Sequence, residues 1–205
     1  MLAATSSIKT NADYDNWIRQ NFFSTPANIR SYISEKLYPP IYDGSLPYRT
    51  PLERLRLTAG EFIVQCNAIA VLNAYGRTGA WGSTFSVPPA VHSQDLLYVF
   101  NQGGAVPFPG STAQDEKIAE GMQGDIVRFV MTGDPTGRDG GGSARSPRWQ
   151  EGGSVLDWNA DPGGVKAVRP AADNDRCAWW LKGLWAPEEG TGMGTGMGTG
   201  TLTVL

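Results

Sequence analysis

The stretch Val87-Pro88-Pro89-Ala90-Val91-His92-Ser93-Gln94-Asp95-Leu96-Leu97-Tyr98-Val99-Phe100 contains the only histidine of the chain. Two successive prolines restrict the backbone, so we expect a stiff turn that sets the direction of the His92 imidazole. An imidazole with an ordinary pKa of about 6.5 can accept and return a proton near neutral pH, as a general base must. A second interpretation stays open, that of a structural histidine packed against Tyr98 and Phe100.

Three other stretches accompany this turn. They are LYPPIYDG at 37–44, FVMTGDP at 129–135 and DNDRCAWW at 173–180. In the second stretch, Gly133 predicts the left-handed end of a helix and Pro135 prevents its continuation. Together with the histidine turn, and in the same order, these stretches resemble the C-terminal part of the type B carboxylesterases. These form the cholinesterase and lipase family of α/β hydrolases, and the likeness is to its fungal members in particular, over roughly residues 5–186.

The resemblance implies a fold class and a domain organisation. The fold is an α/β fold, the C-terminal fragment of an α/β hydrolase, with helices, the last strands of the sheet and an incomplete central sheet. Residues 1–187 would belong to this carboxylesterase domain. Residues 188–205 repeat Gly, Thr and Met and are expected to form a flexible low-complexity tail.

The resemblance also gives the histidine turn a role. His92 takes the place of the general base in a Ser-His-acid triad, which removes a proton from serine and returns it to the leaving alcohol. Asp95 fills the family's acidic position three residues later, and we expect Asp95 and Ser93 to line the pocket or to lie beside it. The substrate of the full-length protein would be a carboxylic ester, and no cofactor is implied.

The other two members of the triad have no match in the sequence. The family's serine lies in a Gly-x-Ser-x-Gly elbow, which none of the 205 residues form. Ser143 and Ser154 lack the final glycine and follow His92, whereas the order in this fold is serine, acid, histidine. Solvated carboxylates are the expectation for the acidic residues that precede His92, which are Asp13, Asp15, Glu35, Asp43, Glu53 and Glu61. We therefore expect a truncated ester hydrolase that is inactive alone.

Two alternative functions remain. The first is a non-catalytic binding or adhesion module, as some members of this superfamily are, although the retained histidine disfavours it. The second is a hydrolase of unrelated design that uses Ser93 or Asp95 with His92. Neighbouring side chains on a chain point apart, which disfavours this arrangement.

The two cysteines, Cys66 and Cys177, lie on either side of the histidine turn. The resemblance implies that they form the family's C-terminal disulfide, and two buried free thiols are the alternative. A bridge would close a loop of about 110 residues, worth about 4 to 5 kcal/mol in the chain-entropy model. It would also imply a secreted or extracellular parent protein. The first residues, MLAATSS, show neither the basic start nor the apolar core of a signal peptide.

Composition and charge narrow the classes of partner. The formal net charge is −3, and the 17 lysines and arginines are dispersed, so we expect no nucleic-acid partner. No apolar run approaches the length needed to cross a bilayer, so we expect no membrane span. One histidine and two cysteines cannot provide a zinc site of three or four nitrogen and sulfur ligands.

Periodicity predicts the remaining elements. Helices are expected at 13–21, 25–36, 52–75 and 112–131, with Thr25 as a helix cap, a break at Gly60, and a helix weakened by Gly121 and Gly124. Strands are expected at 80–87 and, as a pair, within 153–168. The first strand would have an unpaired edge, so we expect marginal stability and possible self-association.

Overall fold

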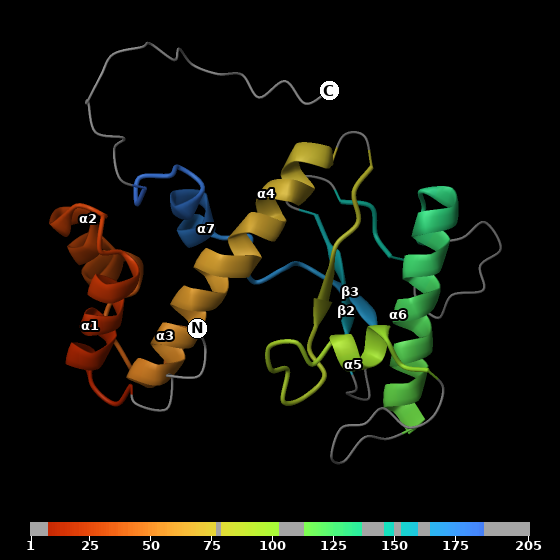
Figure 1. Ribbon diagram of the computed structural model, residues 1–205, viewed down its shortest axis with the longest axis horizontal. Coiled ribbons are helices and arrows are strands. Elements are labelled where there is room, and N and C mark those ends of the chain that lie inside the picture. The colour runs from red at the N-terminus through yellow and green to blue at the C-terminus, as the bar shows by residue number, and fades with distance from the viewer. Residues whose placement is uncertain are drawn as a thin grey trace, which may run out of the picture. The chain divides into compact units, whose positions relative to one another are not determined.

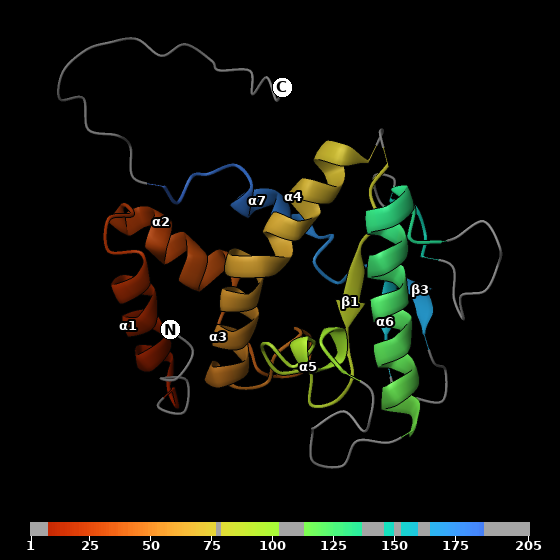
Figure 2. The same ribbon diagram turned by 45° about the vertical axis from the view of Figure 1, so that its right-hand side comes forward.

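The computed structural model describes residues 8–76, 79–102, 113–136, 146–149, 153–159 and 165–186. The described residues separate into two compact units, one with residues 8–59 and 182–186 and the other within residues 60–181. The tail at 188–205 and Ser143 lie outside the described residues. Figures 1 and 2 show the elements of both units.

The first unit is helical. Helix α1 (Asn11–Asn21) begins with a capping box in which Thr10 Oγ1 accepts from the Asp13 amide and Asp13 Oδ2 accepts from the Thr10 amide. Helix α2 (Ala27–Tyr32) continues into the π-helical turn η2 (Ile33–Leu37), and helix α3 spans Pro51–Gly60. The core of the first unit consists of buried side chains from these elements and from the residue after η2: Tyr14, Ile18, Ile33, Tyr38 and Leu55.

The predicted cap at Thr25 is wrong. Pro26 takes the N-cap position of α2, and no side chain caps this helix. The Thr25 hydroxyl instead donates to the Trp185 carbonyl at 2.5 Å, a partner 160 positions away that local sequence patterns cannot reveal.

The predicted helix break at Gly60 is also wrong. The backbone of Gly60 is helical, with φ −62° and ψ −45°, and the chain continues into the π-helical turn η3 (Glu61–Gln65) and helix α4 (Cys66–Tyr75). A glycine in a helix costs only about 1 kcal/mol, which packing on either side can offset. By length and composition alone this helical stretch, Pro51–Tyr75, could cross a membrane, contrary to the expectation that the chain has no membrane span. The core helix of a soluble protein passes the same test, and Leu55, Cys66 and Ile69 are buried.

The second unit contains a three-stranded sheet in the order β1-β2-β3. Strand β1 (Ser83–Phe85) pairs in parallel with β2 (Val155–Trp158), and β2 pairs antiparallel with β3 (Lys166–Val168). The predicted strand at 80–87 is thus shorter than expected, although Trp81 forms an isolated bridge with Arg148. The positive φ of Gly79 (120°) and the prolines at 88 and 89 limit it on either side.

Helices cover both faces of this sheet, with α4 on one side and α6 (Ala113–Thr132) on the other (Figures 1 and 2). On the first side, a Cβ at Gly82 would lie 2.8 Å from both Leu72 and Val155, so only glycine allows this approach. On the second side, a buried cluster joins the sheet, the histidine turn and α6: Val87, Tyr98, Ile118, Ala119, Met122, Leu156 and Trp158. Helix α6 ends at Gly133 with φ +73°, as the Thr-Gly-Asp-Pro pattern predicts.

The predicted disulfide is confirmed. Cys66 in α4 and Cys177 in helix α7 (Asp175–Trp180) are bridged, with Cα atoms 4.9 Å apart and a sequence separation of 111. Asn174 caps α7 by accepting from the amides of Arg176 and Cys177. The bridge therefore fixes the last helix to the helix that precedes the histidine strand.

Candidate functional site

The histidine turn begins directly after strand β1. Val87 is buried, the Pro88–Pro89 peptide bond is cis, and both Ala90 (φ 51°) and Ser93 (φ 67°) adopt left-handed backbone conformations. His92 lies between these two residues and is exposed. Because β1 and β2 are parallel, the turn leaves the sheet at the carboxyl end of both strands, the edge where open α/β sheets bind ligands.

A buried glutamine lies beneath the turn. Gln94 is 3% exposed, and its Oε1 accepts from the Val91 amide at 3.1 Å while its Nε2 donates to the Pro88 carbonyl at 3.4 Å. The Gln94 amide in turn donates to the Val91 carbonyl at 3.1 Å. These bonds close the loop on both sides of Ala90.

The short helix α5 (Leu96–Val99) anchors the turn to the rest of the unit. Tyr98 is 1% exposed, its ring packs edge-on against Phe85 at 4.8 Å, and its hydroxyl donates to Asp115 Oδ1 at 2.8 Å. Burial, followed by the bond to the Asp115 carboxylate, raises the pKa of Tyr98 to about 12. From α6, Gln123 Nε2 donates to the carbonyls of Tyr98 and Asn101 at 3.0 and 2.7 Å.

The three side chains singled out from the sequence share this turn without bonding to one another. Within the described ranges, no hydrogen bond joins His92 to a hydroxyl or a carboxylate. Ser93 is exposed, and its carbonyl accepts from the Leu96 amide. Asp95 takes the N-cap position of α5, but its side chain forms no cap hydrogen bond. The supporting residues Gln94, Asp115 and Gln123 were not predicted, because a polar residue in a turn or on a helix is expected at the surface.

The acidic residues that precede His92 have several roles. Asp13 belongs to the α1 capping box, and hydrogen bonds to the amide of Lys9 and then to Thr10 lower its pKa. Asp43 accepts from Ser45, and Glu53 accepts from the Arg49 amide. Glu61 contradicts the expectation of a solvated carboxylate: its side chain is 1% exposed and is paired with Arg176.

One further carboxylate, Asp157 in β2, has incomplete hydrogen bonding. It is 6% exposed, its neighbours across the sheet are Thr84 and Lys166, and its Oδ1 has no hydrogen-bond partner in the part of the chain that the structure describes. No hydrogen bond in the same part connects it to His92, and we assign it no catalytic role.

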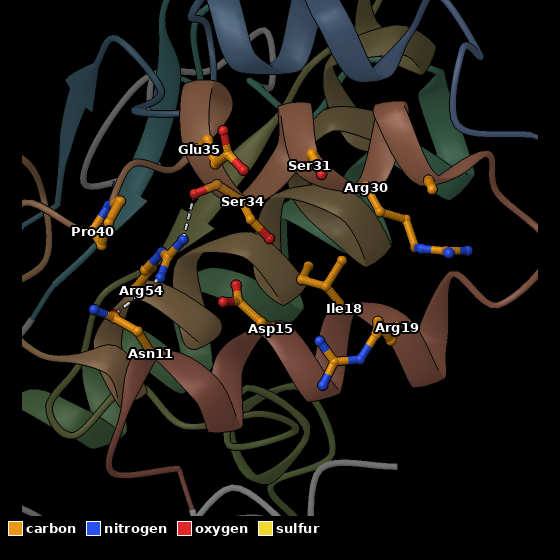
Figure 3. A pocket seen from close by; sticks show the side chains of 11 residues that line it. Asn11, Asp15, Ile18, Arg19, Arg30, Ser31, Ser34, Glu35, Pro40 and Arg54 are labelled. Atoms are coloured by element: carbon orange, nitrogen blue, oxygen red, sulfur yellow. Dashed lines mark hydrogen bonds between the residues drawn. The ribbon is translucent and has the colours of Figure 1, made fainter.

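A pocket of about 300 Å³ in the first unit is lined mostly by charged and hydroxyl side chains (Figure 3). Its wall includes the buried Arg54, which donates from Nε to the Tyr38 carbonyl at 2.8 Å and from Nη1 to Asn11 Oδ1 at 3.3 Å. Asp15 and Glu35 also line it, together with Ser31 and Ser34. The residues that line this pocket pair no hydroxyl with an imidazole, so it does not match a serine hydrolase site.

A second pocket, of about 490 Å³, lies in the second unit beside Trp81, Asp134 and Arg148. Its buried Ser146 donates from Oγ to Asp125 Oδ2 at 2.8 Å, and Asp125 also pairs with Arg128. This serine lacks an imidazole neighbour among the lining residues, which a serine nucleophile would need as its base. Among the residues that the structure describes, no group of three or more His, Cys, Asp or Glu could hold a metal ion.

The curated relatives that match this chain are carboxylesterases. No family model matches the chain. It is 35% identical over 179 residues to carboxylesterase patB of Aspergillus clavatus, covering 87% of this chain and 30% of that protein. It is 31% identical over 180 residues to carboxylesterase patB of Penicillium expansum, again covering 87% of the chain and 30% of the relative.

A solved structure is similar to this chain in fold. Aspergillus niger EstA superposes with a TM-score of 0.64 at 17% identity, over 85% of this chain and 36% of that chain. The predicted fold class, part of an α/β-hydrolase fold, is thereby confirmed. The chain spans about a third of the length of the proteins that it matches.

Proposed function

Since the chain belongs to the carboxylesterase family of the α/β hydrolases, we propose that it forms the part of a carboxylic ester hydrolase that provides the general base. In this proposal His92 removes the proton from a serine hydroxyl as the hydroxyl attacks the ester carbonyl. It then gives the proton to the leaving alcohol, and the acyl-enzyme is hydrolysed by the same base acting on water.

One observation carries the proposal: His92 lies on an ordered turn at the carboxyl end of β1, in a chain whose relatives are carboxylesterases. The buried amide of Gln94 holds this turn, and the exposed imidazole is accessible to groups from outside it. Ser93 and Asp95 would border the ester site beside the base.

The sequence offers no counterpart of the serine nucleophile or of the acid. We infer that both groups lie on polypeptide outside these 205 residues. A serine hydrolase without its nucleophile loses nearly all of its rate enhancement. We therefore expect the chain alone to hydrolyse p-nitrophenyl acetate at the background rate.

A chimera tests the proposal directly. The 205 residues would replace the matching segment of the Aspergillus clavatus relative, and ester hydrolysis would be measured with and without His92→Ala. We expect turnover in the chimera and a loss of about 10⁴-fold or more in kcat for the variant. A folded chimera, shown by a cooperative melt, whose turnover is unaffected by His92→Ala would refute the role of His92.

A second candidate is a non-catalytic binding module with the same fold. The observation that favours it is that His92 forms no hydrogen bond with a hydroxyl or a carboxylate in the described ranges. Under this alternative the folded chimera shows no turnover with or without His92. The disulfide leads us to infer, under either function, that the parent protein occupies an oxidising compartment, outside the cell or in a lumen.

A further inference from the structure

The polar side chains behind His92 lie in an apolar environment. Gln94 is 3% exposed, Asp115 is 5% exposed, and Tyr98 is 1% exposed within the cluster that includes Ile118 and Leu156. Burying a polar group is unfavourable unless it is hydrogen-bonded, so the bonds of these three residues determine which conformation is stable.

The Gln94 carboxamide acts on the turn from both of its ends. Its oxygen accepts from the Val91 amide, and its nitrogen donates to the Pro88 carbonyl. Among uncharged side chains, only an amide of this length offers both a strong acceptor and two donors. A leucine or methionine would leave the backbone groups of the turn without these partners.

The turn needs such support because its backbone is unusual. Ala90 and Ser93 have φ values of 51° and 67°, and residues other than glycine are disfavoured in that region. Such conformations persist when surrounding contacts hold them, and Gln94 bonds to the backbone on each side of Ala90. Without these bonds we expect the turn to sample other conformations and His92 to change direction.

Tyr98 anchors the segment that follows Gln94 to helix α6. Its hydroxyl donates to Asp115 Oδ1, and its carbonyl accepts from Gln123 Nε2. Its ring also packs edge-on against Phe85 of β1. The end of the turn is therefore held by α6 and β1, while Gln94 holds the backbone on either side of Ala90.

We propose that Gln94 is a positioning residue for His92, and that the bond from Tyr98 to Asp115 anchors helix α5, which follows the turn. The effect of this role on catalysis rests on the proposed function. The effect of Gln94 on the conformation of the turn does not rest on it, so the two effects can be tested separately.

The first test uses the full 205-residue chain and amide hydrogen exchange of the Val91 N–H, the group that Gln94 Oε1 accepts from. We expect Gln94→Met to speed this exchange by at least about 10-fold, because the amide loses its acceptor, while exchange in α6 changes by less than about 2-fold. Gln65→Met is the matched control, since Gln65 is exposed, and it should leave the Val91 rate unchanged. An unchanged Val91 rate in Gln94→Met would overturn the proposal.

A milder variant covers the case in which Gln94→Met fails to fold. Tyr98→Phe keeps the ring against Phe85 and removes only the hydroxyl that donates to Asp115. We expect a smaller rise in the Val91 rate, about 3-fold, with the fold retained. A folded Tyr98→Phe chain with the original Val91 rate would contradict the supporting role of Tyr98 and Asp115.

The second test uses the chimera. Gln94→Met should lower kcat by at least about 30-fold and leave KM within about 2-fold, because a misdirected base affects the transition state more than substrate binding. Gln94→Glu should restore part of kcat, since a carboxylate still accepts from the Val91 amide. An unchanged kcat would refute a positioning role, whereas a chimera inactive even with Gln94 would refute the proposed function and leave the exchange result standing.

Discussion

The carboxylate of Glu61 is almost completely buried, and its partners explain why this burial is tolerated. Arg176 donates from Nη2 to Oε1 at 2.6 Å and from Nε to Oε2 at 2.8 Å, and Asn174 Nδ2 donates to Oε1 at 3.2 Å. Glu61 and Arg176 lie close in the chain to Cys66 and Cys177, so this ion pair and the disulfide hold the same two helical segments together.

Removing this charge should destabilise the second unit. Glu61→Gln leaves the Arg176 guanidinium without its anion. Since Arg176 is 23% exposed and can recover part of its hydration, we expect a loss of about 2 to 3 kcal/mol rather than the larger cost of a fully buried cation. Urea unfolding measures the effect, and Glu120→Gln on the exposed side of α6 is the control. Equal stability of the two variants would show that the pair contributes nothing.

Tyr98 predicts how stability depends on pH in the alkaline range. Its folded pKa of about 12 lies above the ordinary value of 10.0, so the folded state holds the proton more tightly than the unfolded state does. This contribution is complete below about pH 10 and is lost as the pH rises toward 12. Urea midpoints measured from pH 9 to 12 should fall less steeply in Tyr98→Phe than in the original chain, and parallel curves would contradict the assignment.

At the scale of helices and strands, Gly121 shows why an element cannot be judged alone. From the sequence alone, this glycine is expected to weaken helix α6. In the structure, a Cβ at Gly121 would lie 2.8 Å from Cζ3 of Trp158, which is 5% exposed in the core. The indole of Trp158 in β2 fills the space that a side chain at Gly121 would need.

Two alanine substitutions in the same helix should therefore have opposite effects. Gly121→Ala should destabilise by about 1 to 3 kcal/mol, because the added methyl group overpacks the core against Trp158. Gly124→Ala meets only the flexible end of Arg128 at 3.1 Å, and better helix propensity should stabilise it by up to about 1 kcal/mol. Thermal unfolding of both variants makes the comparison, and stabilisation by both would show that Trp158 adapts freely.

The sequence could predict the features that depend on contacts between residues close to one another in the chain. The helices at 11–21 and 113–132, the paired strands within 153–168 and the left-handed stop at Gly133 depend on neighbours a few positions away, and periodicity and turn chemistry predict them closely. The bond of Thr25 to Trp185 and the packing of Gly121 join distant segments, and these were predicted wrongly or missed. At the candidate site, His92 stands out by its type, whereas Gln94 has no local signal that distinguishes it from a surface amide.

At the scale of the whole molecule, the sheet of the described residues ends at an edge strand. Strand β1 lies at one end of the three-stranded order, and Ser83 and Thr84 are exposed. An unpaired strand edge can add a strand from a second copy. Exposed apolar side chains on α6, including Val130 and Met131, add to this tendency.

We therefore expect the purified chain to self-associate and to melt with low stability. Thr84→Lys places a charge on the edge strand and should shift the sedimentation distribution toward monomer at equal protein concentration. Gln20→Lys, at an exposed position on helix α1, controls for the change in net charge. A monomeric chain with a cooperative midpoint well above 50 °C would contradict both expectations.

The bridge between Cys66 and Cys177 has a consequence for the lifetime of the protein after cleavage. A protease that cuts once anywhere between those positions produces two fragments that remain covalently joined. The peptide that carries His92 would then stay attached to the rest until the cystine is reduced. On a gel such nicked molecules would run as one band without thiol and as two bands with it.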